Sequence, residues 1–201
     1  MMSDDPVQPL AEDRANDLAL AQAARAAKPG AFERLVRTHQ RLVWHVVQRL
    51  VRDTEDSREL CQEAFLRVHR HLHQYRGESR LSTWVGRVAY HVALRHLERK
   101  CIELVDPHEG QDPDELLAQA VDPLDLEDQA ASTQLQRRLH AAIEDLPPLP
   151  RTLLTLYHLE ELPIPEIAQI TGLASGTIKS HLFRARLKLR ASLIPEGEPD
   201  A

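Results

Sequence analysis

The sequence predicts an all-α protein in which two small helical domains are joined by an acidic linker. Apolar residues recur at steps of three and four along most of the chain, which is the period of an amphipathic helix. No stretch of strand length shows a convincing alternation of apolar and polar residues, so a sheet is not expected. We place the two domains at residues 17–105 and 133–193.

A strongly acidic segment separates these two domains. The 201-residue chain has a net charge of −6, and the excess acid lies in residues 106–132, where nine acidic side chains and no basic one occur. Pro107, Pro113 and Pro123 and the weak periodicity favour a flexible linker there. Its acidity is compatible with a solvated spacer, with repulsion of nucleic acid, or with mimicry of a nucleic-acid strand inside a basic channel.

The first domain is expected to contain three helices. The first follows the break at Pro29-Gly30, and its apolar side chains recur through Phe32–Leu50. Asp53 can cap the second helix through its side chain. Residues Tyr75–Ser79 interrupt the pattern, and Ser82 can cap the third helix.

The second domain is expected to contain four helices. Apolar spacing predicts one over Leu135–Leu146, closed by a proline-rich turn, and another over about Arg151–Glu160. Pro165 can begin a short third helix, because a first-turn proline lacks only an N–H that has no helical partner. Gly172 can take a left-handed turn conformation, and Ser175 can then cap the last helix.

The last predicted helix is basic on every side except its apolar face. Between Ala174 and Pro195 there are five basic residues and no acidic one. A short helix, a turn and a basic second helix form the helix-turn-helix pattern, whose second helix enters the major groove of DNA. A surface helix pair with a solvated basic face is the alternative. The residues expected to meet base edges and phosphates are Thr177, Lys179, Ser180 and His181, and those expected to follow the phosphate backbone are Arg184, Arg186 and Lys188.

A second candidate site lies on the third helix of the first domain. Trp84, Arg87, His91 and Arg95 follow one another at steps of three, four and four and share one helical face. An aromatic ring among basic groups suits single-stranded nucleic acid, because the ring can stack on a base while the cations hold phosphates. The preceding polar segment, Arg76–Thr83, can form a pocket for a flipped base. The alternative is a solvated face beside a core tryptophan.

Other motifs give weaker signals. His69 and His73 lie one helical turn apart and can share a metal ion, although no third ligand is evident. Cys61 and Cys101 can act as a thiol redox sensor, but neither has a clearly basic neighbourhood. No Gly-rich phosphate loop, Ser-His-Asp cue or carboxylate pair is evident, so we expect no catalytic activity, no cofactor and no metal.

Cellular location can also be predicted from the sequence. No uncharged apolar run approaches the roughly 18 residues of a membrane span, and the first residues are acidic where a secretory signal would be basic. We therefore expect a cytoplasmic protein that does not insert into a membrane.

Several of these segments resemble a known family. Three in the first domain, Asp53–Asp56, Gln62–Val68 and Tyr75–Trp84, resemble the promoter-melting domain (region 2) of extracytoplasmic-function (ECF, group 4) bacterial RNA polymerase sigma factors. In the second domain, four segments resemble the domain of these factors (region 4) that binds the upstream promoter element. These segments are Leu156–Leu162, Glu166–Ala168, Thr171–Leu173 and Gly176–Arg186.

The resemblance implies a function in transcription initiation. Such a protein binds the β′ clamp and β flap of core RNA polymerase, directs it to promoter DNA, takes part in melting, and dissociates after initiation. Family members commonly serve stress responses and are usually held inactive by an anti-sigma partner, often a membrane-bound one. A stand-alone helix-turn-helix regulator and an adaptor that binds only proteins are the alternatives, and the basic helix argues against the adaptor.

The resemblance also assigns residues to three surfaces. At His91 and Arg95 the family commonly has Asn and Asp, so the minus-ten preference of relatives does not transfer to this chain. The minus-ten set is Ser79, Arg80, Ser82, Thr83, Trp84, Arg87, His91, Arg95 and Arg99. The minus-thirty-five set is Ser175, Thr177, Lys179, Ser180, His181, Arg184, Arg186 and Lys188. The polymerase-binding set is Asp53, Glu55, Asp56, Leu60, Gln62, Glu63, Leu66 and Arg67.

Overall fold

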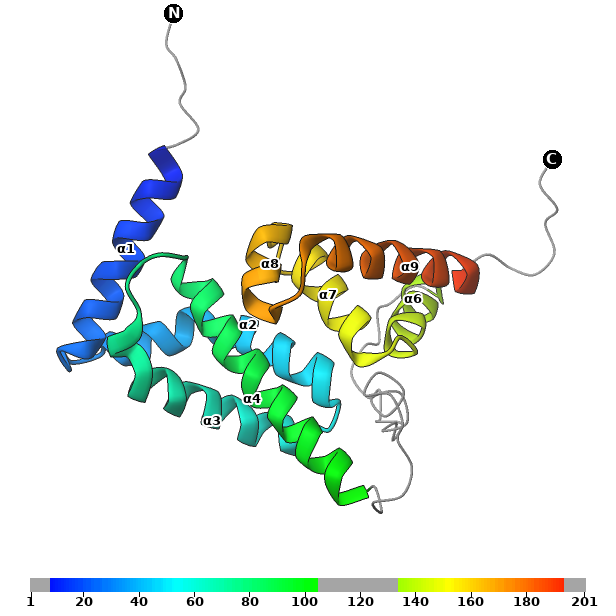
Figure 1. Cartoon of the computed structure of the whole chain (residues 1–201), viewed down its shortest axis with the longest axis horizontal. Helices are drawn as coiled ribbons and strands as arrows, with labels where there is room; N and C mark the ends of the chain where they lie inside the picture. The colour runs from blue at the N-terminus through cyan, green and yellow to red at the C-terminus, as the bar shows by residue number, and fades with distance from the viewer. Residues whose placement is uncertain (1–7, 105–133, 194–201) are drawn as a thin grey trace, which may run out of the picture.

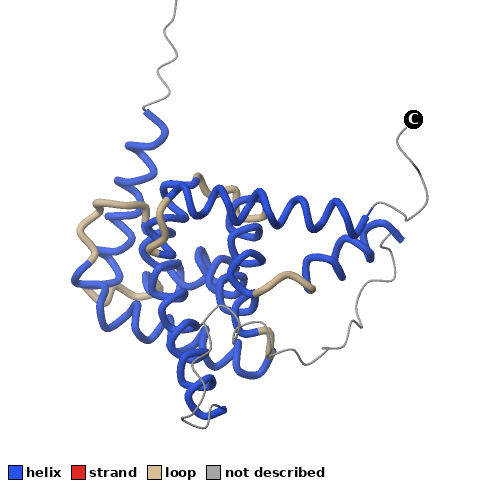
Figure 2. The backbone as a smooth tube through the Cα atoms, turned by 45° about the vertical axis from the view of Figure 1, so that its right-hand side comes forward, coloured by secondary structure: helices blue, strands red, loops and turns tan. Residues whose placement is uncertain are grey.

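The computed structural model describes residues 8–104 and 134–193, and these residues form helices joined by turns and loops (Figure 1). No strand occurs within the described ranges (Figure 2), which confirms the predicted all-α class. We refer to residues 8–104 as the N-terminal part and to residues 134–193 as the C-terminal part. The predicted acidic linker, residues 106–132, lies outside the described residues.

The N-terminal part consists of four α-helices and one 3-10 turn. They are α1 (Gln8–Arg25), α2 (Ala31–Val51), α3 (Thr54–His71), η1 (Leu72–Gln74) and α4 (Leu81–Leu104). The apolar spacing of α2 is its core-facing stripe, since Leu35, Val43 and Val47 are fully buried. Asp53 caps α3 as predicted, because its carboxylate accepts a hydrogen bond of 2.7 Å from the backbone N–H of Asp56. The predicted helices of this part are therefore present.

Helix α1 was not predicted from the sequence. Its segment is rich in alanine and has only three large apolar residues, all leucines, so no apolar stripe marks it in the sequence. Its Asp17 carboxylate accepts a hydrogen bond of 2.7 Å from the backbone N–H of Leu81, the first residue of α4. The prediction that Ser82 caps α4 was wrong, because Ser82 lies inside the helix and a carboxylate from α1 binds its first N–H.

The C-terminal part contains α6 (Gln134–Glu144), α7 (Pro148–His158), α8 (Ile164–Thr171) and α9 (Ser175–Leu193). Helix α7 begins three residues earlier than predicted, because two prolines fit its first turn. Gly172 ends α8 with φ = 77°, the left-handed conformation that the turn requires. The prediction that Ser175 caps α9 was wrong. Ser175 is the first residue of that helix, and a capping residue stands just before the first one.

The two parts pack against each other. Helix α8 lies beside the start of α4, and α7 lies over α2 (Figure 1). Buried side chains from both parts, such as Val46 of α2 and Leu153 of α7, belong to one continuous apolar core. No described helix is long and apolar enough to cross a membrane.

Candidate nucleic-acid interface

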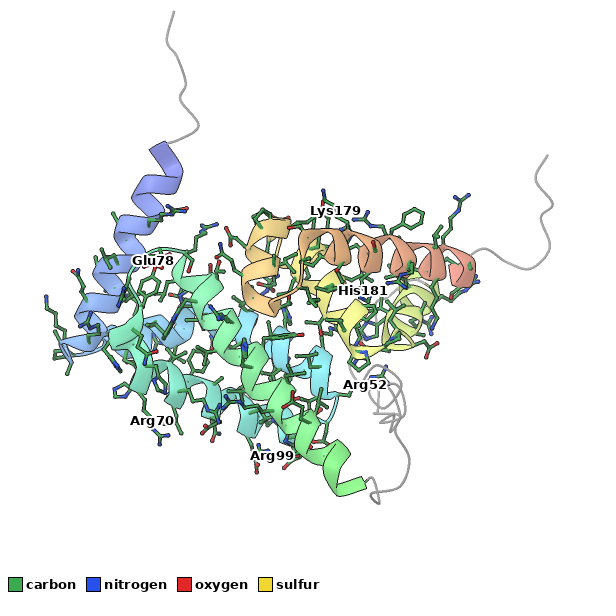
Figure 3. All side chains as sticks on the ribbon, viewed as in Figure 1. Arg52, Arg70, Glu78, Arg99, Lys179 and His181 are labelled. Carbon is green, nitrogen blue, oxygen red and sulfur yellow. The ribbon has the colours of Figure 1, made fainter. Side chains whose placement is uncertain are left out.

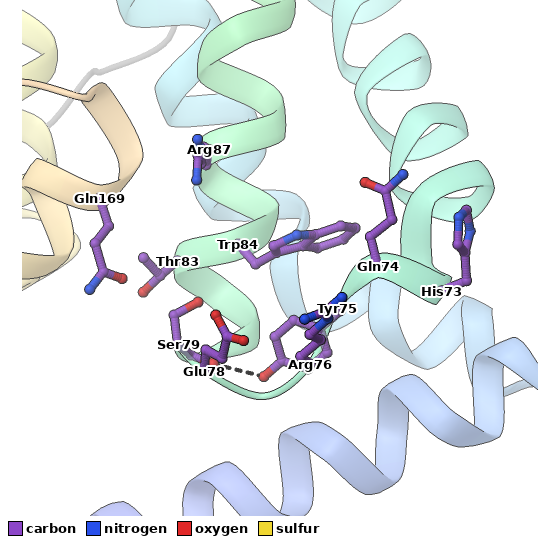
Figure 4. A pocket seen from close by; sticks show the side chains of 10 residues that line it. All are labelled: His73, Gln74, Tyr75, Arg76, Glu78, Ser79, Thr83, Trp84, Arg87 and Gln169. Atoms are coloured by element: carbon purple, nitrogen blue, oxygen red, sulfur yellow. Dashed lines mark hydrogen bonds between the residues drawn. The ribbon is translucent and has the colours of Figure 1, made fainter.

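A hollow of about 850 Å³ opens where the loop before α4 meets the first turns of that helix (Figure 4). Most of its wall comes from α4 and from Arg76–Thr83, the segment predicted to form a pocket for a flipped base. One residue comes from α8. It is lined by His73, Gln74, Tyr75, Arg76, Glu78, Ser79, Thr83, Trp84, Arg87 and Gln169. The polar segment before α4 therefore does border a hollow.

Internal contacts hold the loop before α4 in place. The Tyr75 hydroxyl donates a hydrogen bond of 2.9 Å to the backbone carbonyl of Ser79, which closes the loop. Gly77 has φ = 75°, a conformation that strains any other residue. Burial is the main reason that the pKa of Tyr75 rises to about 12, so its hydroxyl stays protonated and able to donate.

Trp84 contributes an aromatic surface to the same hollow. Its side chain is half-buried, and its ring centroid lies 5.8 Å from that of Tyr75, with the two rings inclined by 54°. In Figure 4 the indole extends from α4 toward Gln74 on the opposite wall. A partly exposed indole supported by a buried tyrosine can stack on an unpaired base.

A second hollow, of about 430 Å³, continues the first along α4. The two share Gln74, Trp84 and Arg87. We call the combined surface the α4 groove. The second hollow is lined by Arg67, His71, Gln74, Trp84, Arg87, Val88, His91 and Arg95. The predicted face of α4 is therefore brought together as one wall of a groove that carries four arginines.

The structure adds residues to this groove that sequence reasoning missed. His71 ends α3 and Gln74 lies in η1, so they come from the opposite wall of the second hollow. Helical spacing groups residues of one helix only, and no signal in the sequence links η1 to α4. Val88 of α4 is half-buried and also lines the groove.

The remaining predicted minus-ten residues occupy different environments. Thr83 is 2% exposed, and its hydroxyl donates a hydrogen bond of 2.8 Å to the Glu166 carboxylate of α8. Arg80 is paired with Asp13 of α1 at 3.0 Å. Ser79 and Ser82 are half-buried, whereas Arg99 is exposed near the end of α4. Thr83 is thus covered by the C-terminal part.

Helix α9 presents its polar residues to solvent. Ser175, Thr177, Lys179, Ser180 and Arg184 are exposed, and Lys179 and His181 can be seen on this helix in Figure 3. Its apolar face is buried at Ile178, Leu182 and Ala185, as the spacing predicted.

Two basic residues of α9 are engaged by neighbouring elements. The Arg186 guanidinium lies 3.3 Å from the Nε2 atom of His158, and its central carbon lies 5.4 Å from the ring centroid of Tyr157. Lys188 donates a hydrogen bond of 3.1 Å to the carbonyl of Asp145. These two side chains are exposed, but each also contacts an element that neighbours α9.

The predicted polymerase-binding residues divide between the surface and the core. Glu55, Gln62 and Leu66 are exposed along one side of α3, and Leu66 is 52% exposed although it is apolar. Leu60 is only 7% exposed, so it supports the helix from the core. Asp56 pairs with His96 and Lys100 of α4, each at 3.3 Å. Asp53 acts as the cap of α3.

Glu63 and Arg67 of the same predicted set lie on the groove side of α3. They pair with each other at 2.6 Å, and Arg67 lines the second hollow. Glu59, which was not predicted, is exposed on α3 together with Glu55 and Gln62. The exposed side of α3 therefore combines acidic, basic and neutral polar residues with one leucine, and its Arg58 pairs with Glu55.

The structure gives little support to the metal and redox hypotheses for His69, His73, Cys61 and Cys101. The His69 ring packs edge-on against Phe32 at 4.9 Å between centroids. No group of His, Cys, Asp or Glu side chains that could hold a metal ion occurs among the described residues. Burial raises the pKa of the Cys61 thiol to about 11, which disfavours a reactive thiolate, and the Cys101 side chain lies outside the described residues.

Comparison with known proteins identifies the family. Sigma-70 region 2 matches residues 35–101, and Sigma-70 region 4 matches residues 136–189. The chain is 31% identical to the ECF RNA polymerase sigma-E factor of Escherichia coli over 180 residues, which cover 87% of this chain and 92% of that protein. This chain belongs to the ECF sigma factors. The recognition made from the motifs is confirmed, and the stand-alone regulator is not favoured.

Other relatives agree with this assignment. The RNA polymerase sigma-H factor of Pseudomonas aeruginosa is 29% identical over 182 residues, covering 89% of this sigma factor and 94% of the relative. The ECF sigma factor SigW of Bacillus subtilis is 26% identical over 166 residues, covering 81% and 89%. This chain is thus a polymerase-associated sigma factor that acts in transcription initiation.

Two solved structures share the fold of this sigma factor. RpoE of Bartonella quintana, in a complex with the anti-sigma factor NepR, superposes with a TM-score of 0.67 at 16% identity, covering 83% of this chain and 99% of that one. CnrH, in a complex with the cytosolic domain of CnrY, gives 0.59 at 20% identity, covering 87% and 95%. At these identities the comparison supports the helical architecture.

Proposed function

We propose that this sigma factor holds the melted minus-ten strand in the α4 groove and reads the minus-thirty-five duplex with α9. Core polymerase binds the exposed side of α3. The observation that carries the proposal is the α4 groove itself, in which the half-buried Trp84, supported by Tyr75, lies beside Arg67, Arg87 and Arg95. Aromatic rings beside cations match the chemistry of single-stranded DNA, which offers bases to stack and phosphates to pair.

The two hollows of the groove bind different parts of the strand. A flipped base enters the larger hollow, where Trp84 can stack on it and the polar loop around Ser79 offers hydrogen-bonding groups. The strand then runs along α4, where Arg87 and Arg95 bind successive phosphates. His71 and Gln74 face the same strand from the other wall and are further candidate contacts.

Energetic considerations explain why polymerase is required. Opening roughly ten base pairs costs about 14 kcal/mol, at about 1.4 kcal/mol for each pair. A base stacked on an aromatic ring returns only about 1–3 kcal/mol. A groove of this size captures few bases, so the polymerase must supply the remaining free energy through its own contacts with the strands, aided by negative supercoiling.

The exposed residues at the start of α9 suit the major groove. Thr177, Lys179 and Ser180 are exposed and lie in the first turns of the helix, where a recognition helix contacts base edges. Arg184 follows one turn later and can reach the phosphate backbone. This arrangement supports sequence reading in the first turns and backbone binding beyond them.

The exposed side of α3 suits a protein partner. Glu55, Glu59 and Gln62 surround the exposed Leu66, so the surface offers an apolar contact within a polar rim. We assign this surface to the polymerase clamp and the C-terminal part to the β flap. An anti-sigma protein that covers the α3 surface would inhibit the factor. In this role the chain acts as a non-catalytic subunit in the cytoplasm, where polymerase is found.

Run-off transcription tests the proposal most directly. A genomic promoter library is transcribed with the purified chain, with core polymerase, and with both, and binding of the two proteins is measured in parallel. We expect transcripts from a small set of promoters only when both components are present. Tight binding to duplex DNA without any affinity for core polymerase would overturn the proposal.

A further inference from the structure

A further hollow lies in the C-terminal part, between one side of α9 and the turn that joins α6 to α7. Its volume is about 300 Å³, at the lower end of the range of about 300–1,000 Å³ that is usual for small-molecule sites. We call this hollow the α9 pocket. It is lined by Leu146, Pro147, Pro148, Leu149, Pro150, His181, Arg184, Ala185 and Lys188.

The turn forms an apolar side of the α9 pocket. None of its five lining residues has a polar side chain, and the three prolines among them have a fixed φ and no backbone N–H to donate. Leu146 and Pro148 are buried, Leu149 and Pro150 are half-buried, and Pro147 is exposed. This side therefore offers a ligand apolar surface and few hydrogen-bond donors.

Two arginines fix the turn in place. Arg52, just after α2, donates hydrogen bonds to the carbonyls of Glu144 and Leu146, the second at 3.1 Å. Arg151 of α7 is fully buried and donates to the carbonyl of Glu144 at 3.2 Å. It also donates to the carbonyl of Arg49, in the last turn of α2, at 2.9 and 2.6 Å. The apolar side of the pocket is thus formed before a ligand binds, which lowers the entropic cost of binding.

The α9 side of the pocket is basic. His181, Arg184 and Lys188 follow one another at steps of three and four, so they lie on the same side of the helix. Arg184 and Lys188 are exposed, and His181 is half-buried. Ala185 lies on this side too, and its small side chain is buried. Of the described residues that line the pocket, none is acidic.

The pocket occupies only one side of the recognition helix. Each residue of a helix turns the chain by about 100°, so Lys179 and His181 lie about 200° apart around the axis of α9. Figure 3 accordingly shows them on different sides of the helix, and Lys179 does not line the pocket. A ligand in the pocket therefore leaves the Lys179 side of α9 open.

The electrostatics of the pocket favour an anion. The Lys188 ammonium donates one hydrogen bond, of 3.1 Å, to the carbonyl of Asp145, and it has two further protons to donate. The Arg184 guanidinium is a planar fork that matches a carboxylate or a phosphate. Helix α7 begins at Pro148 in the apolar side, and the N-terminal end of a helix carries a partial positive charge.

We propose that the α9 pocket binds a small organic anion, in which a carboxylate or phosphate group is attached to a compact apolar body. The anionic group binds Arg184 and Lys188, and the apolar body lies against Leu149 and the prolines of the turn. An apolar hollow with a few convergent polar groups is the usual form of a small-molecule site. The basic side selects for a negative charge, and the apolar side selects against a bare ion such as inorganic phosphate.

Such a ligand competes with the minus-thirty-five duplex. Arg184 and Lys188 are proposed to bind the phosphate backbone, so the ligand and the duplex require the same cations. This competition rests on the proposed function, whereas binding of the anion does not. At ten times its dissociation constant, a competing ligand weakens duplex binding by about 10-fold. An anion of this class would thereby lower promoter recruitment without a further protein partner.

Binding is tested by NMR on the full-length, ¹⁵N-labelled chain with four probes. The probes 1-naphthoate and 1-naphthyl phosphate carry both an anionic group and an apolar body, whereas 1-naphthalenemethanol lacks the charge and inorganic phosphate lacks the apolar body. We expect the first two to shift the amide signals of Leu149 and Ala185, with dissociation constants on the order of 1 mM. The other two should bind about 10-fold more weakly or less. The tighter of the first two identifies the preferred anionic group.

Pocket variants are compared with a matched control. Arg184→Gln with Lys188→Gln removes both cations from the pocket, and Leu149→Asp places a carboxylate on its apolar side. The control, Arg137→Gln with Arg190→Gln, makes the same change in net charge as the double variant, at exposed residues that do not line the pocket. We expect both pocket variants to bind 1-naphthoate about 10-fold more weakly or less, and the control to bind it as the wild type does.

Competition is measured by fluorescence anisotropy with a labelled minus-thirty-five duplex and the wild-type chain. We expect 1-naphthoate at ten times its dissociation constant to weaken duplex binding by about 10-fold. Unchanged duplex affinity would reject the competition, while the NMR result would still establish the pocket. If the wild type does not bind the duplex at all, the proposed function of α9 fails and the anion site stands.

Three results would overturn the anion site itself. Signal shifts confined to the α4 groove, or spread over the whole surface, would show adventitious binding only. An equal loss of binding in the control and in the double variant would mean that net charge alone attracts the probe. Inorganic phosphate that binds as tightly as 1-naphthyl phosphate would reject the contribution of the apolar side.

Discussion

The α4 groove and the exposed surface of α9 differ in how the fold creates them. The α9 surface is a single helix whose exposed side chains are spaced by the helix itself. The α4 groove has walls from α3, η1, the loop before α4 and α4, and its loop is fixed by Asp17 of α1. One surface thus depends on local sequence, and the other depends on contacts between distant segments. Substitutions away from DNA should therefore weaken the groove more than they weaken α9.

The largest effect is expected for Trp84→Ala. Loss of one stacked base costs about 1–3 kcal/mol, which corresponds to about 5- to 150-fold weaker open-complex formation. Recruitment to the minus-thirty-five duplex should be unchanged, and Trp84→Phe should retain part of the activity. Permanganate footprinting of the melted strand, together with a duplex-binding assay, measures both. Open complexes at wild-type levels would remove Trp84 from the proposed strand contacts.

The α9 surface can be tested with three single substitutions. Lys179→Ala and Arg184→Ala should each weaken binding to the upstream element and make the salt slope shallower by about one. Arg186→Ala should have a smaller effect on the slope, because Arg186 is engaged by Tyr157 and His158. Anisotropy titrations between about 50 and 200 mM salt measure the slopes. Equal salt slopes for the three variants would show that Arg186 binds DNA despite its contacts with Tyr157 and His158.

Asp17→Ala tests the dependence of the groove on a distant contact. The substitution removes the carboxylate that binds the first N–H of α4, and we expect a loss of about 1–2 kcal/mol in the free energy of unfolding. Single-strand binding should also weaken, although Asp17 does not line the groove. Urea unfolding and anisotropy measure the two effects. Binding of the upstream duplex is the control and should not change.

The stability of the N-terminal part should depend on pH through His39. Burial lowers the pKa of this histidine, and the charge of Asp17 opposes the shift. The unfolded chain therefore binds a proton at a higher pH than the folded chain does. Stability should be fully present above about pH 6.5 and should fall as the pH decreases below that value.

The effect of His39 is expected to be the smallest of the four. It should remain below about 1.4 kcal/mol per pH unit, the limit for one proton. Urea unfolding at pH 7.5 and 5.5 checks it, with His39→Gln as the comparison. A pH dependence that is the same in both proteins would mean that other groups cause it.

The sequence predicted more of the α9 surface than of the α4 groove. The helix-turn-helix was predictable because Gly172 and the apolar residues of α9 act through local geometry, within one turn or one helix. Trp84, Arg87, His91 and Arg95 were also grouped correctly, since helical spacing places them on one face. His71 and Gln74 were missed because they reach the groove from other elements. Helix α1 was missed because its alanine-rich sequence has few large apolar residues to mark a buried face.

The sequence alone determined the helices other than α1, the segregation of acidic and basic residues, and the family, because these follow from residue order over short distances. Only the tertiary structure decided that Asp17 caps α4, that Thr83 is buried against Glu166, and that Arg52 and Arg151 bind the opposite helix ends. These contacts join residues 64 to about 100 positions apart. Residues so far apart in the sequence become partners because whole helices pack together. The local pattern of apolar and polar residues does not tell which helices will pack side by side.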